Sequence, residues 1–259
     1  NGDYVFKGVL AGKHTLNASK VGYCPLDEVI TVSNTAKEFN EVMTPIPGIG
    51  DVRLLSTWHA SPLNLDSYVK GYVNSNEIIK VSYKVREEAA IRLHVDERFG
   101  YGAEVMTVGN STARSKATFY IHDRVERNAS LIDSGARVYL IDSDCNRLVI
   151  DINNAEVTID NATNHSGNFW HAFDYCGNGA LDINNIKIVN KIVSEEPDLP
   201  DCGISGQVRD ALNASIVLEN VAVSVRSDGS VDSGNTDAGG NYSLKNVVSG
   251  NRQLDGYKA

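Results

Sequence analysis

The chain has 259 residues, of which 42% are hydrophobic, and a formal net charge of −9. That length accommodates one large or two to three smaller domains, and the apolar fraction is sufficient to form hydrophobic cores. The negative charge argues against nucleic acid or an anionic membrane surface as partner, and no apolar run approaches the roughly 20 residues of a membrane-spanning helix.

A motif at the start of the chain returns near its other end. Residues 2–23 read GDYVFKGVLAGKHTLNASKVGY, and residues 240–257 read GNYSLKNVVSGNRQLDGY. In each copy a tyrosine is followed by alternating apolar residues, a glycine turn and a second short strand, which predicts a β-hairpin. Further strands are predicted at 28–33 and 39–43. The linker at 44–50 contains two prolines and two glycines and therefore indicates a domain boundary.

The next stretch, to about residue 193, contains one short strand pattern after another and few helix-period segments. Strands are expected at 52–57, 78–85, 91–95, 104–108, 117–122, 136–141, 147–150, 156–160, 169–175 and 186–192. An acidic linker containing proline follows at 194–201. Beyond it, strands are expected at 204–209 and 222–226. The pattern predicts an all-β chain with a central β-sandwich domain flanked by two partial sandwich segments.

Short motifs in the two terminal segments resemble a known β-sandwich family. They are AGKHTL (11–16), VGY (21–23), SGQVRD (205–210), NVAVSV (220–225), TDAGGNYSL (236–244) and SGNRQL (249–254). The pattern is similar to the carboxypeptidase regulatory-like sandwich, also called Cna-B or transthyretin-like, which has an immunoglobulin-like architecture. Residues 1–47 resemble its C-terminal part and residues 202–259 its N-terminal part. A chain that opens in mid-domain suggests a processed subunit or one repeat of a longer polypeptide.

The central domain, residues 48–193, resembles an LTWG-type surface β-domain of bacteria and algae. The matching segments are LLSTWHASPLNLDSYV (54–69), LHVDERFGYGAEVMTV (93–108), ARVYLID (136–142) and NFWHAFDYCGNGALDINNI (168–186). Departures from the family pattern occur at His59, Asn64, Tyr68 and Ala103. Because the family is known as an accessory surface module, the resemblance implies no catalytic activity. Trp58 and Trp170 are expected to anchor the core of this domain; the alternative is an exposed pair that stacks on sugars.

Acidic residues in these segments allow a metal interpretation. Asp66 in an Asn-x-Asp context, Asp96 in an Asp-Glu pair and Glu104 after a glycine-rich turn offer the hard oxygen ligands that Ca²⁺ takes, of which it needs ~6 to 8. The other interpretation is that these residues cap turns and bind backbone amides. Asn64 and Tyr68 replace two ligands that the parent motif would supply. The cofactor prediction is therefore none, with Ca²⁺ as the candidate if one is bound.

Four cysteines without C-x-x-C spacing argue against zinc. Cys145 and Cys176 lie in the later strands of the central domain, so we expect an intradomain disulfide between them. Cys24 and Cys202 lie one in each partial sandwich. They form an intersubunit bridge if the C-terminal part of one subunit is completed by the N-terminal part of the next. The alternative is a set of reduced, buried thiols in a cytosolic protein.

Seven Asn-x-Ser/Thr sequons indicate a glycoprotein located outside the cell or at its surface. Several lie in predicted turns, where a covalent N-glycan would be accessible. The acceptor residues are Asn17, Asn110, Asn128, Asn161, Asn164, Asn213 and Asn241.

No enzymatic signature is present, since the sequence contains no GxSxG, HExxH, P-loop or dinucleotide fingerprint. The first functional hypothesis is therefore a structural subunit of an extracellular fibre or stalk, joined head to tail to copies of itself by complementation of half-domains. The residues expected to enter the neighbour's core are Val29, Ile30, Val32, Phe39 and Val42. The second hypothesis is a carbohydrate- or calcium-dependent binding module of a cell-surface adhesin. A weaker third is the non-catalytic part of a secreted hydrolase.

Overall fold

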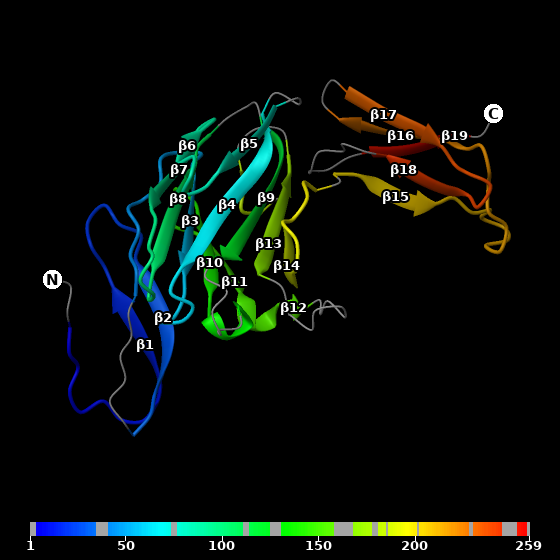
Figure 1. Ribbon diagram of the computed structural model, residues 1–259. Helices are drawn as coiled ribbons and strands as arrows, with labels where there is room; N and C mark the ends of the chain where they lie inside the picture. The colour runs from blue at the N-terminus through cyan, green and yellow to red at the C-terminus, as the bar shows by residue number, and fades with distance from the viewer. Residues whose placement is uncertain are drawn as a thin grey trace.

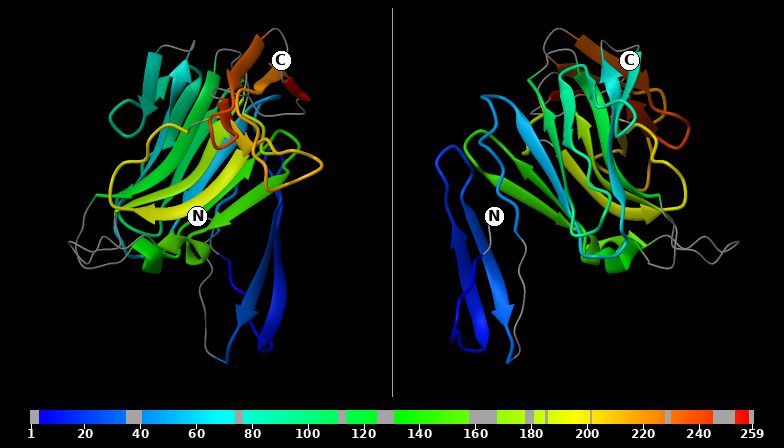
Figure 2. Two further views of the ribbon diagram at one scale, coloured as in Figure 1. Left: turned by 90° about the vertical axis from the view of Figure 1, so that its right-hand side faces the viewer. Right: turned by 60° about the vertical axis from the view of Figure 1, so that its left-hand side comes forward.

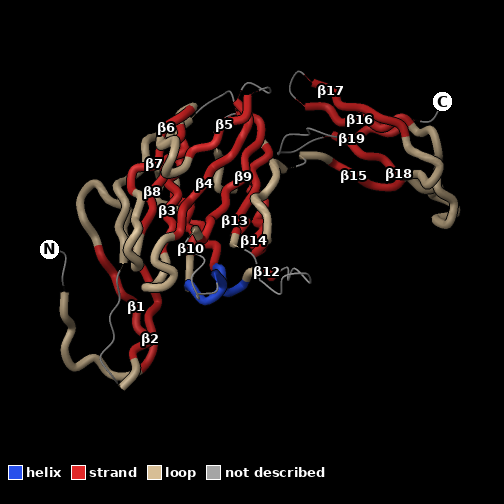
Figure 3. The backbone as a smooth tube through the Cα atoms, viewed as in Figure 1, coloured by secondary structure: helices blue, strands red, loops and turns tan. Residues whose placement is uncertain are grey.

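The structure, a computed structural model, describes residues 4–34, 41–73, 77–110, 114–124, 131–157, 168–177, 181–184, 186–200, 202–227, 230–244 and 253–257 (Figure 1). Apart from two single-turn 3₁₀ helices, η1 (Leu131–Ser134) and η2 (Ile152–Asn154), the regular structure in these residues is β-strand (Figure 3). The predicted all-β class is therefore confirmed. Within the described ranges, no helix has the length and apolarity needed to cross a membrane.

In the residues that the structure describes, the central domain is a sandwich of two six-stranded sheets (Figure 1). The first sheet has the order β11 (Arg147–Asp151), β10 (Arg137–Ile141), β3 (Val52–Thr57), β8 (Ala103–Val108), β7 (Ile91–Val95), β6 (Glu87–Glu88). The second has the order β12 (Glu156–Val157), β14 (Ile186–Val193), β13 (Phe169–Cys176), β9 (Arg114–Asp123), β4 (Leu65–Val73), β5 (Glu77–Val81). The pairs are antiparallel except for β12 with β14. Alternating burial along β8 shows how a period of two directs one row of side chains into the space between the sheets.

Both tryptophans are core residues, as predicted. Trp58 is 4% exposed and Trp170 is fully buried, and both belong to the main hydrophobic cluster between the sheets. The Trp170 indole Nε1 donates a hydrogen bond to Asn190 Oδ1 at 2.9 Å, which satisfies its polar end. Phe119 and Phe173 stack across neighbouring strands with ring centroids 5.2 Å apart. The sandwich is therefore held by a continuous apolar layer with aromatic anchors from both ends of its sequence.

Smaller sheets lie at opposite ends of this sandwich (Figures 1 and 2). At one end, β1 (Gly12–Ala18) and β2 (Leu26–Val32) form a two-stranded antiparallel sheet. At the other, β15 (Ile204–Gln207) pairs with β18 (Asn241–Leu244), and β16 (Ala222–Ser227) pairs with both β17 (Ser230–Asn235) and β19 (Gln253–Tyr257). A small cluster of Val221, Val223, Val225 and Leu244 forms the core of the C-terminal sheets.

The TDAGGNY segment forms a tight turn, and its residue types explain why. The Asp237 carboxylate Oδ1 accepts hydrogen bonds from the backbone N–H groups of Gly239 and Asn241, each at 2.8 Å. Gly240 has φ +70°, and a Cβ there would lie 2.8 Å from the Val208 carbonyl oxygen. Glycine is therefore required both by the left-handed conformation and by the close approach of the neighbouring chain.

Several strand predictions were wrong. Residues 4–11 contain no strand, and β1 starts at Gly12 and pairs with β2, because the β-branched segment at 26–32 provides a long partner strand. In the second copy of the motif, β18 and β19 belong to different sheets and do not form a hairpin, because β18 pairs with β15 and β19 pairs with β16. Residues 41–43 are not strand, and 39–40 lie outside the described residues. Strand β4 was not predicted at all.

The disulfide predictions also need correction. Cys24 is bonded to Cys145, with Cα atoms 5.4 Å apart, and Cys176 is bonded to Cys202, with Cα atoms 5.5 Å apart. The predicted Cys145–Cys176 and Cys24–Cys202 bonds are therefore not formed. A disulfide requires two cysteines whose Cβ atoms lie close together and face each other. The assignment of cysteines to the same predicted domain does not show which of them lie close together. Each bond instead joins a terminal segment to the central sandwich.

Candidate functional site

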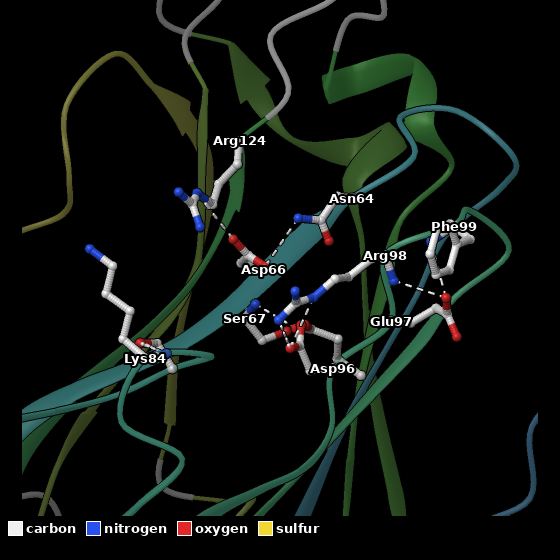
Figure 4. A network of polar contacts seen from close by, with 11 residues as sticks. Asn64, Asp66, Ser67, Lys84, Asp96, Glu97, Arg98, Phe99 and Arg124 are labelled. Carbon is white, nitrogen blue, oxygen red and sulfur yellow. Dashed lines mark hydrogen bonds and ion pairs between the residues drawn. The ribbon is translucent and has the colours of Figure 1, made fainter.

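The three acidic residues singled out in the sequence lie together at one end of the central sandwich. Asp66 is on β4 of the second sheet, Glu104 is on β8 of the first, and Asp96 directly follows β7. One carboxylate oxygen from each lies within 4.8 Å of the other two. Figure 4 shows Asp66 beside Arg124 and Asn64, and Asp96 beside Arg98 and Ser67. Segments from both sheets therefore build this carboxylate cluster.

Each carboxylate of the cluster uses one oxygen to accept a hydrogen bond from the protein. The donors and distances are Arg98 Nη2 to Asp96 Oδ2 at 2.6 Å, Ser67 N to Glu104 Oε2 at 2.5 Å, and Asn64 Nδ2 to Asp66 Oδ1 at 3.4 Å. The other oxygen of each carboxylate is buried and has no hydrogen-bond partner among the described residues, and the same holds for Asn64 Oδ1. The cluster thus contains buried acceptor oxygens that accept no hydrogen bond from the described residues.

Burial dominates the electrostatics of the cluster. Desolvation raises the pKa of the Asp66 carboxyl to about 6, although the Arg124 guanidinium, 3.6 Å away, acts in the opposite direction. Desolvation likewise raises the pKa of Glu104 to about 8, against the lowering effect of the hydrogen bonds from Ser67. Both residues are 1% exposed. Charged carboxylates at these positions therefore lack adequate compensation from the protein.

Sequence reasoning missed Asn64 as a contributor, because it was treated as a departure from the family motif. Asn64 and Asp66 are two positions apart at the start of a strand, and residues i and i+2 project to the same side of a strand. That spacing was a usable signal. The donors Ser67 and Arg98 were also missed, since nothing in the sequence separates them from ordinary polar residues.

A cleft of about 420 Å³ separates the N-terminal sheet from the first sheet of the sandwich. It combines aromatic and charged side chains, and its lining includes Trp58, Tyr101, Tyr139, Glu41, Arg137 and Ile30. Tyr101 is 63% exposed, whereas Tyr139 is 6% exposed. The cleft therefore offers a polar-aromatic surface next to the terminal sheet.

The predicted assembly residues occupy different environments. Val29 is 69% exposed on β2. Ile30 and Val32 are partly buried, and Val42 packs against a small cluster that contains Cys24. Phe39 lies outside the described residues. Among the described members of this set, Val29 alone has most of its surface exposed.

The structure describes four of the seven predicted glycosylation positions, Asn17, Asn110, Asn213 and Asn241, and all four are exposed. Asn128, Asn161 and Asn164 lie outside the described residues. Exposure is a requirement for modification, and modification itself stays a prediction.

Comparison with known proteins yields no relative: no protein-family model, no curated protein and no solved structure matches the chain. The resemblances to the carboxypeptidase regulatory-like and LTWG-type families therefore stay predictions.

Proposed function

We propose that this chain is a structural subunit of an extracellular fibre or surface stalk, which associates head to tail with copies of itself through its two terminal sheets. The observation that supports this most directly is the placement of those sheets at opposite ends of the central sandwich (Figures 1 and 2). Contact between unlike ends of identical subunits is heterologous. Such contacts generate an open filament unless the rotation from one subunit to the next closes the chain of subunits into a ring.

The terminal sheets have strand edges available for pairing. Among the described residues, β1 and β2 form a sheet only with each other, and β15 pairs only with β18. An isolated two-stranded hairpin is at best marginally stable in water, and an exposed edge is a template for a strand of another chain. Association of the two ends would therefore stabilise both.

Apolar side chains near these edges provide a driving force. Phe6 is 67% exposed, Leu10 80% and Val29 69%, while Leu254 on β19 is 48% exposed. Burying side chains of this size contributes about 1.5–3 kcal/mol each. Association costs an estimated 4–15 kcal/mol in lost translational and rotational freedom. Several such residues must therefore be buried together, which favours extended strand pairing over a single point of contact.

Both ends are firmly attached to the centre. Each is joined by a disulfide, Cys24–Cys145 or Cys176–Cys202. The linker before Cys202 is also held, because Glu196 forms ion pairs with Lys70 at 3.3 Å and Lys80 at 2.5 Å. These attachments would transmit tension along a fibre. Because Cys24 and Cys202 are each bonded within the chain, association of the ends would not use the predicted intersubunit bridge.

The test compares variants in sedimentation velocity and negative-stain imaging. We expect the wild-type chain to form linear oligomers that grow with concentration, and a V29K/L254K double variant to remain monomeric, because charged edge residues oppose strand addition. The matched control is V149K/I188K, which changes two residues of the central sandwich with 47% and 49% exposure. Monomeric wild-type protein, or equal assembly by both double variants, would contradict the proposal.

The cleft favours a second candidate function, the binding of a carbohydrate by a surface module. Aromatic rings beside charged groups are suited to stack on sugar faces while bonding their hydroxyls. Glycan-array binding should be lost in Tyr101→Ala and retained in Phe99→Ala, since Phe99 is 84% exposed and does not line the cleft. If no glycan binds the wild-type chain, this candidate is wrong.

A further inference from the structure

We propose that Asp66, Asp96 and Glu104, together with Asn64, form a divalent-cation site that takes Ca²⁺ and links the two sheets of the central sandwich. This inference is independent of the head-to-tail assembly. It rests on two separate observations, the convergence of the carboxylates and the missing partners of their buried oxygens.

The missing partners point to a ligand. In the described part of the chain, eight buried side-chain nitrogen or oxygen atoms have no hydrogen-bond partner, and four of them are oxygens of these residues: Asn64 Oδ1, Asp66 Oδ2, Asp96 Oδ1 and Glu104 Oε1. Asp66 and Glu104 are 1% exposed, and the Asp96 side chain is 6% exposed. Because buried polar groups in folded proteins are nearly always satisfied, three carboxylates that each keep a buried oxygen without a hydrogen bond indicate a bound cation. Of these three oxygens, Asp66 Oδ2 has a longer ion pair, with Arg124 Nε at 3.6 Å.

The hydrogen bonds inside the cluster hold these oxygens in position. Arg98 Nη2 binds one oxygen of Asp96, and the Ser67 amide binds one oxygen of Glu104. In each case the second oxygen is left without a donor. Arg98 and Arg124 approach from the solvent side, with side chains 58% and 42% exposed. Two partly solvated guanidinium groups therefore offset three carboxylates incompletely.

The spacing and the donor types select the ion. Ca²⁺ binds oxygens at about 2.3–2.6 Å, so ligands on opposite sides of the ion lie up to about 5 Å apart. The carboxylate oxygens here lie within 4.8 Å of one another. Mg²⁺ requires about 2.0–2.1 Å and near-ideal octahedral geometry, which would demand a tighter cluster. No sulfur or imidazole nitrogen belongs to the set, which disfavours zinc. Water would complete the coordination of Ca²⁺.

The position of the site defines its role. Asp66 belongs to β4 of the second sheet, whereas Glu104 belongs to β8 of the first and Asp96 follows β7 of the same sheet. The Ser67 amide on β4 already bonds to Glu104 across the interface. A cation held by all three carboxylates would strengthen this link, so Ca²⁺ would stabilise the sandwich against separation of its sheets.

The test uses the full chain freed of metal with EDTA and then titrated with CaCl₂, followed by calorimetry and thermal unfolding, with MgCl₂ in a parallel titration. We expect Ca²⁺ to bind and to raise the unfolding temperature, with a smaller effect of Mg²⁺. Glu104→Gln should lower the Ca²⁺ affinity at least ~10-fold while leaving the metal-free protein as stable as wild type or more so, because a buried glutamine is neutral without taking up a proton.

The matched control is Glu87→Gln, which alters an exposed acidic residue paired with Arg92 on the short edge strand β6. It should retain the full response to Ca²⁺. Two results would overturn the proposal: a wild-type unfolding temperature that Ca²⁺ leaves unchanged, as expected if protons alone neutralise the cluster, or the same increase in wild type and Glu104→Gln. Retained stability of metal-free Glu104→Gln excludes misfolding as the cause of lost binding.

Discussion

Raising the pH of the metal-free protein should destabilise it, and the carboxylate cluster determines by how much. The pKa of Glu104 is raised from 4.5 to about 8, chiefly by burial. A carboxyl whose pKa is higher in the folded chain binds more protons there than in the unfolded chain. The carboxyl therefore contributes its full stabilisation at pH values below its pKa in the unfolded chain. This stabilisation is lost as the pH rises through its pKa in the folded chain.

The magnitude follows from the same pKa values. Between about pH 5 and 8, Glu104 alone should lower the free energy of unfolding by about 1.4 kcal/mol per pH unit. The total approaches about 5 kcal/mol, which is large beside a typical net stability of 5–15 kcal/mol. Asp66, with a pKa raised to about 6, adds a further decrease below that pH. Glu104 is 1% exposed, so solvent screening reduces the effect little.

The assay is urea unfolding in EDTA at a series of pH values. Wild-type protein should lose stability steadily from pH 6 to 8, and Glu104→Gln should show a nearly level curve in that interval. Saturating Ca²⁺ should abolish the decrease, because a cation binds the deprotonated ligands. A metal-free wild-type stability that stays constant or rises between pH 6 and 8 would refute the reasoning.

The remaining predictions concern the framework. Replacing Cys24 and Cys145 by alanine removes a bond that spans 121 residues and should release the N-terminal sheet, so hydrogen exchange should accelerate in β1 and β2 while β9 and β13 stay protected. Leu140→Ala, at a fully buried position, should cost about 2–5 kcal/mol in urea unfolding, against about 0.5 kcal/mol or less for the exposed control Val149→Ala. Gly240→Ala, at φ +70°, should cost about 1–3 kcal/mol and loosen the C-terminal sheets in hydrogen exchange, whereas Gly239→Ala should cost less.

Local patterns sufficed for much of the architecture. Strands β3 and β7 occupy the residues predicted for them. In β7, the apolar residues Ile91, Leu93 and Val95 alternate with polar ones, and this period of two needs no tertiary information. The Asp237 turn was recognisable for a similar reason, since its hydrogen bonds connect residues within the same short segment. Strand β4 was not predicted because Asp66 and Ser67 are polar residues that are nevertheless buried, so its sequence does not alternate between apolar and polar residues.

Tertiary structure alone decided which distant groups meet. The acidic residues of the candidate calcium site were recognisable by type, but only the packing of β4 against β8 brings Asp66 to Glu104 and leaves their second oxygens without donors. The cysteines show the same limit, because Cys24 reaches Cys145 across 121 residues through the docking of the N-terminal sheet. Side-chain chemistry and periodicity are properties of short segments, whereas disulfide pairing and ligand geometry depend on distances between segments that are set only when the sheets pack.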